Sequence, residues 1–224
     1  MIKWKNIDLR ELGIIVEKTP EISKGKKKIN IYEIPGRNGF LSVDTGVYEP
    51  FSITLECHCL DTANKDEIKK LLDGFGTLTF DNQRQYYAVI NDAIPFEKVL
   101  RFKRFQINFL VNPVAEDIDI TTVSITSNPQ TLNIQNSYSN IEPILKITCT
   151  GNVSITINNK TFTLSDTNGS YILDCKNKII VDSNGNNKSS LMRYDFPTLV
   201  NGNNSIEYTG TITNFTIEYR KTYL

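Results

Sequence analysis

One stretch decides the fold of this chain: Val153-Ser-Ile-Thr-Ile157, then Asn158-Asn159, then Lys160-Thr-Phe-Thr-Leu164. Apolar and polar residues alternate on either side of the two asparagines, which is the period-two pattern of a half-buried strand. Asn tolerates the positive φ angles that a two-residue hairpin turn requires. The stretch therefore predicts an antiparallel β-hairpin with one apolar face.

The same pattern continues along the second half of the chain. Tyr171–Cys175 and Lys178–Asp182 form a second predicted hairpin, and Ser205–Thr209 and Phe215–Arg220 form a third across Gly210–Asn214. Short strands with turn signals about every 8–12 residues are typical of an antiparallel sandwich. We therefore expect the second half to be a β-sandwich.

The first half is also mostly strand, with one helix. Ile68, Leu71 and Leu72 fall at helical spacing and predict an amphipathic helix over Asn64–Asp73, which Gly74 ends. The predicted strands of this half are Ile14–Lys18, Lys28–Glu33, Phe51–Leu60, Gly76–Phe80, Tyr86–Asn91 and Phe102–Val111. The fold class that follows is mainly β.

The composition changes between the two halves. Residues 1–115 contain 17 Lys and Arg against 15 Asp and Glu, whereas residues 116–224 contain 8 against 10. Asn rises from 8 residues in the first part to 16 in the second. With a Pro-containing break at Val111-Asn-Pro113, this change predicts two domains, 1–122 and 123–224.

Charge and hydropathy restrict the partners. The chain carries 25 Lys and Arg against 25 Asp and Glu, so it lacks the basic field of a general nucleic-acid binder. Its one basic run, Lys24–Lys28, is interpreted as a charged loop, with a phosphate-contacting arm as the alternative. We expect no membrane partner, because apolar runs long enough to span a bilayer are absent. The opening residues lack the apolar stretch of a secretory signal, which predicts synthesis in a cytoplasm.

The residues that carry chemistry are few. The one His, His58, lies between Cys57 and Cys59, and strand geometry turns the His away from the two thiols, so we expect no metal site. Asp182–Asn186 resembles a calcium loop but has Asn187 and Arg193 where such a loop needs Gly and Glu. Motifs for a serine nucleophile, a P-loop or a dinucleotide site do not occur. We expect no catalytic residues, no cofactor and no enzymatic activity.

Two segments contain unusual concentrations of turn residues. Glu33-Ile-Pro-Gly-Arg-Asn-Gly39 imposes a sharp excursion between strands and presents Arg37 on it. Asp195–Ile206 combines an aromatic–proline corner with an Asn-Gly turn. Each segment is interpreted as a rigid turn, with contact to a partner as the alternative.

Together these segments resemble the distal tail protein (Dit) family of long-tailed phages that infect Gram-positive bacteria, a siphovirus tail component. The family motifs D-x-x-x-x-G-(I/V), (I/V)-P-G-R-(N/D)-G, G-x-Y, R-F-K-R-F, P-I-(I/L)-x-I and D-F-P-x-L-x-x-G-x-N-x-I occur here in the same order. They match Asp8–Ile14, Ile34–Gly39, Gly46–Tyr48, Arg101–Phe105, Pro143–Ile147 and Asp195–Ile206. One departure is Val200-Asn201 before Gly202, where the family often has Pro.

This resemblance implies a structural virion protein at the tail tip, assembled in the bacterial cytoplasm. The implied fold is an N-terminal split β-barrel belt domain with one helix, over 1–122, and a C-terminal galectin-like β-sandwich, over 123–224. Six belts would close a homohexameric ring, through which DNA may pass. The implied partners are the tail tube protein, the tail-tip or baseplate proteins and, in some members, receptor-binding proteins.

The turn at Pro35, Gly36, Arg37, Asn38 and Gly39 is the candidate subunit interface. A head-to-tail ring needs two different patches on each subunit, and a rigid excursion suits one of them. The guanidinium of Arg37 can make several directional hydrogen bonds from such a turn.

Two other functions remain open on the residues alone. One is a carbohydrate-binding protein acting through the C-terminal sandwich, for which the candidate stacking residues are Tyr138, Tyr171, Tyr194 and Tyr208. The other is a wall hydrolase with a carboxylate pair, because such pairs converge only in three dimensions.

Overall fold

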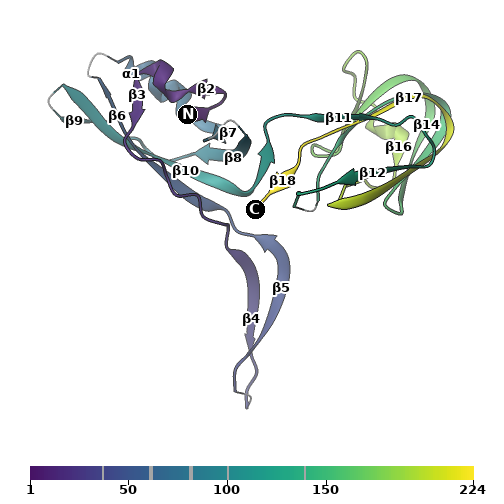
Figure 1. Ribbon diagram of the computed structural model, residues 1–224, viewed down its shortest axis with the longest axis horizontal. Coiled ribbons are helices and arrows are strands. Elements are labelled where there is room, and N and C mark those ends of the chain that lie inside the picture. The colour runs from purple at the N-terminus through teal and green to yellow at the C-terminus, as the bar shows by residue number, and fades with distance from the viewer. Residues whose placement is uncertain (37, 61–62, 81–82, 100, 139) are drawn as a thin grey trace. The chain divides into compact units, whose positions relative to one another are not determined.

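The computed structural model describes residues 1–224 apart from 37, 61–62, 81–82, 100 and 139 (Figure 1). The chain is mainly β, as predicted, and divides into two compact units. The first unit comprises Met1–Glu116 and Leu224, and the second comprises Asp117–Tyr223. Among the described helices, none is long and apolar enough to cross a membrane.

The first unit is built on one curled antiparallel sheet whose strand order is β2-β1-β7-β8-β10-β6-β3, with β9 paired to β10. The long central pair joins β6 to β10 in unbroken register from Phe51↔Val111 to Leu60↔Phe102. The elements are β1 (Lys3–Trp4), β2 (Ile7–Asp8), η1 (Leu9–Leu12), β3 (Ile14–Val16), β6 (Phe51–Leu60), α1 (Lys65–Leu71), β7 (Gly74–Thr79), β8 (Arg84–Ile90), β9 (Glu97–Val99) and β10 (Phe102–Asp117).

One face of this sheet holds the core of the first unit. Alternate residues of β6 and β10 are buried there, and the Trp4 and Phe109 rings meet edge to face at 5.1 Å. The predicted helix is confirmed as α1, which Asn64 caps by accepting a bond from the Asp66 amide at 3.2 Å. The Trp4 indole donates to the Leu71 carbonyl at 2.9 Å and so fastens the helix to the sheet.

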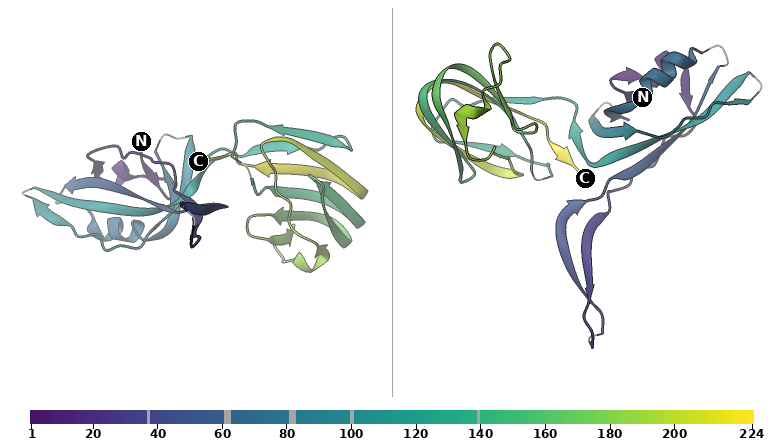
Figure 2. Two further views of the ribbon diagram at one scale, coloured as in Figure 1. Left: turned by 90° about the horizontal axis from the view of Figure 1, so that it is seen from below. Right: turned by 180° about the vertical axis from the view of Figure 1, so that it is seen from behind.

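A separate two-stranded hairpin, β4 (Lys27–Glu33) and β5 (Phe40–Tyr48), extends from the first unit (Figures 1 and 2). We call it the arm. The predicted strand Lys28–Glu33 is found as β4. The sequence does not predict a strand over Phe40–Tyr48, and there the structure differs, because this segment pairs with β4. Its apolar–polar alternation is short, Leu41-Ser-Val-Asp44, and lies between the turn signals Gly39 and Gly46.

The second unit is a sheet that folds back on itself into two layers. One layer is formed by β15, the second half of β14, the first half of β13, the second half of β17, and β11. The other contains β16, the remaining halves of those three strands, and β12. The elements are β11 (Thr121–Ser124), β12 (Gln130–Ile134), β13 (Ile144–Ile157), β14 (Lys160–Asp174), β15 (Ile179–Asp182), η2 (Ser189–Leu191), β16 (Met192–Arg193), β17 (Gly202–Tyr219) and β18 (Thr222–Tyr223).

The first predicted hairpin of this unit is confirmed. Strands β13 and β14 pair up to Ile157↔Lys160, and the turn residues Asn158 and Asn159 have φ of 50° and 64°. The second hairpin is also found, with β14 and β15 paired from Tyr171↔Asp182 onward.

The third predicted hairpin is wrong, because Gly210–Asn214 is not a turn. The two predicted strands of this hairpin belong to the continuous strand β17, and both pair with β13. The register shifts between Thr150 and Ser154, where the sheet bends. Gly210 lies at this bend with φ +94°, and a Cβ there would approach the Asn152 carbonyl oxygen to 2.5 Å. The glycine marks a sheet bend, which a sequence cannot distinguish from a turn.

We predict that Gly210→Ala destabilises the second unit. The substitution adds left-handed strain and a backbone clash, which together cost about 2 kcal/mol or more and lower Tm by about 8 °C. Gly185→Ala is the matched control, because Gly185 has φ +81° but nothing within 4 Å of its Cβ position. Calorimetry measures both variants. Equal losses of Tm would contradict the proposed role of the close approach at Gly210.

Candidate assembly surfaces

The arm exposes large apolar side chains along its whole length. Every residue of β4 and β5 is exposed except Tyr48, which is half-buried. The exposed fraction is 63% for Phe40, 61% for Ile31 and 56% for Val47. The other large apolar residues exposed on the arm are Ile29, Tyr32, Ile34, Leu41 and Val43. Exposed apolar patches of this kind mark interaction sites on soluble proteins.

These side chains lie on both faces of the arm. Residues paired across an antiparallel ladder share a face, and successive residues alternate between faces. The register therefore places Ile29, Ile31 and Phe40 on one face, since these residues pair with Asp44, Ser42 and Glu33. By the same register Tyr32, Leu41 and Val43 lie on the opposite face. A hairpin that covered a core would have one apolar face, so the arm is built to be covered on two sides.

Polar contacts fasten the arm near its root. The Lys27 ammonium pairs with the Asp44 carboxylate, which also accepts the Gly46 amide at 2.9 Å. Lys27 and then Gly46 hold the pKa of Asp44 below its ordinary value. The Thr45 hydroxyl donates to the Lys28 carbonyl at 2.6 Å. The fastening is therefore polar and solvent-exposed.

The candidate interface residues lie at the tip of the arm. Pro35, Gly36, Asn38 and Gly39 are exposed there, and the two glycines have φ of +81° and +95°. Arg37 lies outside the described residues. The predicted excursion is thus the turn of a long hairpin.

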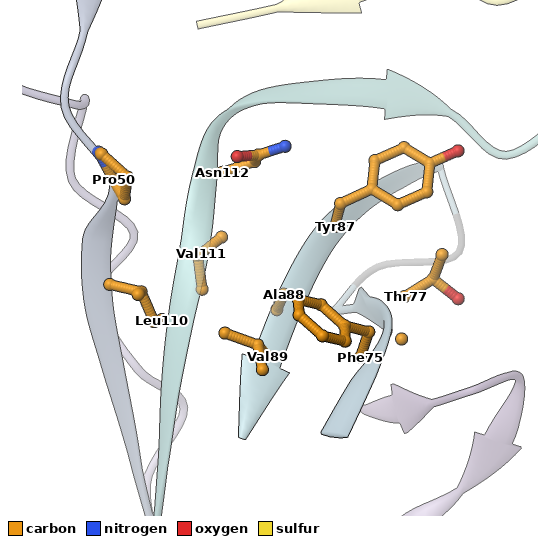
Figure 3. A pocket seen from close by; sticks show the side chains of 10 residues that line it. Pro50, Phe75, Thr77, Tyr87, Ala88, Val89, Leu110, Val111 and Asn112 are labelled. Carbon is orange, nitrogen blue, oxygen red and sulfur yellow. The ribbon is translucent and has the colours of Figure 1, made fainter. Parts of the chain in front are cut away.

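An apolar groove lies on the first unit, over β7, β8 and β10. Its volume is about 380 Å³, and Figure 3 shows Phe75 beside Val89, with Leu110 on a neighbouring strand. Phe75 is 83% exposed and Leu110 is 42% exposed. Pro50, which joins the arm to β6, also lines the groove. The sequence analysis missed this groove, because its residues come from separated strands and none belongs to a recognisable motif.

The one histidine belongs to a small polar cluster on an exposed face. Glu17 Oε1 lies 3.3 Å from His58 Nδ1 and accepts a bond from Arg104 Nε at 3.0 Å. Cys57 and Cys59 point to the opposite, buried face, as predicted. Burial raises the pKa of the Cys57 thiol to about 12, so the thiol stays protonated at neutral pH.

The other candidate ligands and nucleophiles are also in structural roles. All four cysteines are free and buried, and burial raises the pKa of Cys175 to about 12. In the described part of the chain, no group of three His, Cys, Asp or Glu side chains is placed to hold a metal. The Asp182 carboxylate accepts the amides of Asn184 and Asn186 at 2.9 Å, which makes a polar turn.

The candidate tyrosines do not form one exposed face. Tyr171 is only 7% exposed and belongs to the core of the second unit. Tyr208 packs against that core, with its ring 6.2 Å from that of Phe215. Tyr194 is 75% exposed, on a residue with φ 77°. The expectation that these tyrosines together line a carbohydrate site is therefore wrong for Tyr171, whose ring is inside.

The segment Asp195–Ile206 is held by a buried asparagine. Asn204 is fully buried, its carboxamide oxygen accepts the Val200 amide at 2.8 Å, and its nitrogen donates to the Val200 carbonyl at 2.9 Å. The Asn158 side chain donates to the same oxygen at 2.7 Å. These bonds tie the segment to the β13–β14 turn, which supports the interpretation of a rigid turn.

Comparison with solved structures gives a clear likeness of fold. No protein-family model matches the sequence, and no curated protein matches it. The structure is similar to the crystal structure of SPP1 Dit (gp 19.1), described as a paradigm of the hub adsorption apparatus in phages that infect Gram-positive bacteria. The TM-score is 0.79 at 14% identity, over 100% of this chain and 98% of that one. The resemblance predicted from the short motifs is thereby confirmed as a likeness of fold.

Proposed function

We propose that this protein is a structural component of a phage tail, a distal hub that joins the tail tube to the baseplate or tail-tip proteins. Six copies form a ring, and the ring docks host-adhesion proteins. The observation that supports this proposal most strongly is the arm, whose two apolar faces are exposed in the single chain. The fold likeness to SPP1 Dit over the whole chain supports the same role.

The arm and the groove are proposed as the two halves of the ring contact. A closed ring of identical subunits needs two different surfaces that fit each other. The arm presents apolar side chains such as Phe40, and the groove presents Phe75 and Leu110. The tip residues Pro35, Gly36, Asn38 and Gly39 are proposed to reach the neighbouring copy, and Arg37 is proposed to contribute to the same contact. The groove lies at the root of the arm, so each copy carries both surfaces.

The proposed role is non-enzymatic and needs no cofactor. The protein is made in the bacterial host and resides in the virion at the tail tip, where the ring leaves a passage for DNA. The first unit forms the ring, and the second unit supplies docking surface for other tail proteins. Of the four candidate tyrosines, all of which the structure describes, Tyr194 is exposed, Tyr138 and Tyr208 are half-buried and Tyr171 is buried. One exposed aromatic is too little to propose a carbohydrate-binding role for the second unit.

We predict that single polar substitutions on either surface weaken assembly. Phe40→Ser on the arm and Phe75→Ser in the groove each remove a large exposed apolar side chain from one of the two proposed surfaces. Each should cost about 2 kcal/mol of association, which raises the concentration for half-assembly about 30-fold. Tm of the dilute chain should change little, because both side chains are exposed. Analytical ultracentrifugation across a dilution series measures the effect.

The matched control is Tyr194→Ser, an equally exposed aromatic in the second unit. This variant should assemble as the parent chain does. A parent chain that stays monomeric at high concentration would contradict the ring. Normal assembly of both test variants would contradict the assigned surfaces.

We predict that the first unit alone carries assembly. The predicted boundary at residue 122 falls inside β11, whereas the two compact units divide between Glu116 and Asp117, at the end of β10, and the fragments are cut there. Fragment 1–116 contains the arm, the groove and a complete core, and it should form rings. Fragment 117–224 should be a folded monomer, since its own core is closed. Light scattering distinguishes the two, and rings formed by 117–224 alone would overturn the assignment.

A further inference from the structure

We infer that docking orders the arm: the hairpin of β4 and β5 is the conformation of the assembled protein, and in the free chain the arm is largely unfolded. The inference rests on the proposed function, because docking supplies the missing contacts. It adds that ring formation is a coupled folding and binding step.

The arm lacks what stabilises other hairpins of this protein. It forms a sheet of only two strands, and its strand residues are exposed apart from the half-buried Tyr48. An isolated two-stranded hairpin is marginally stable at best in water, because its few hydrogen bonds must offset the entropy lost on ordering. The arm therefore needs burial from outside to hold its shape.

The β13–β14 hairpin gives the internal comparison. It turns through two residues, Asn158 and Asn159, and Ile155 and Phe162 of its inner face are almost fully buried in the core. Both of its strands also have further neighbours in the sheet. The two hairpins differ in burial and in neighbouring strands, which makes β13–β14 the natural reference for the arm.

The internal contacts of the arm are weak ones. The Lys27–Asp44 pair is solvent-exposed, and exposed ion pairs contribute little and are screened by salt. The strand register shifts between Lys27 and Ile29, so the ladder is interrupted next to that pair. Gly46, with φ +72°, adds a residue that loses much freedom on ordering. These contacts set the register of the hairpin but do not hold it folded.

Coupled ordering has a consequence for assembly. Each docking event includes the entropy cost of fixing the arm, so the ring forms only above a higher concentration than the apolar contacts alone would require. Fixing the arm beforehand removes that cost. A cross-link within the arm should therefore strengthen assembly without adding any contact to the neighbour.

Hydrogen exchange on the full chain tests the free state. In the dilute monomer, amides of Ile29–Tyr32 and Leu41–Val43 should exchange nearly as fast as in an unstructured peptide. Amides of β13 should be protected, by a factor of about 100 or more relative to the arm. In the assembled protein the arm should become protected as well. Arm amides as slow as those of β13 in the dilute monomer would overturn the inference.

A disulfide across the arm tests the energetic consequence. Asn30 and Val43 lie directly opposite each other, so Asn30→Cys with Val43→Cys places two thiols for oxidation. The native cysteines are all buried and do not compete. The oxidised variant should reach half-assembly at a concentration about tenfold lower than the same variant after reduction. The control pair, Thr131→Cys with Ser205→Cys, lies across paired strands of the second unit. Its oxidised and reduced forms should assemble equally, which separates the effect of the arm cross-link from general effects of the oxidant and reductant.

The outcomes separate the inference from the proposed function. Equal assembly of the oxidised and reduced arm variants would overturn coupled ordering while leaving the ring intact. A chain that never assembles would contradict the ring, and exchange in its dilute monomer would still decide whether the arm is ordered. A slow-exchanging arm in that monomer counts against the inference, and a fast-exchanging arm supports it.

Discussion

Apolar side chains on both faces of a two-stranded arm are the constraint on which the account depends. Ile31 and Phe40 occupy one face, Tyr32 and Leu41 occupy the other, and all four are exposed in the single chain. Exposure of apolar surface to water is unfavourable in free energy, and a hairpin of only two strands has no second layer against which to bury it. The free energy gained by covering the arm is therefore available only to a partner. The proposed partner is a second copy of this chain, whose groove at Phe75 is apolar.

The rest of the first unit holds the arm by its root. Gly25 approaches Pro113 of β10 so closely that a Cβ on Gly25 would come within 2.6 Å of the proline Cβ. Lys24 stacks its ammonium over the Tyr48 ring at 5.3 Å, at the end of β5. The sheet and helix α1 form an independent core below these contacts. Rigid support at the root and exposure along the strands are what an assembly arm requires.

The sequence predicts the elements whose apolar residues recur with a regular period-two or helical spacing. It does not predict features that depend on how separate strands come together. Alternation over Val153–Leu164 and helical spacing over Asn64–Asp73 give the right elements, because one face of each packs on a core. Strand β5 is not predicted because its alternation, Leu41-Ser-Val-Asp44, is short and lies between two glycines. Gly210 looked like a turn because a sheet bend and a turn place the same demand on φ. The groove could not be predicted, since Phe75 and Leu110 meet only through strand order.

The central claim is that the arm of one copy lies in the groove of another, and cysteine cross-linking between two different chains tests it most directly. Ile31→Cys in one chain and Leu110→Cys in the other are mixed and mildly oxidised, with the four buried native thiols as silent background. The account predicts mixed disulfide dimers, which should form faster at concentrations at which the chain assembles than at concentrations at which it is monomeric. Cross-links between two arms, or none between arm and groove in assembled protein, would contradict it.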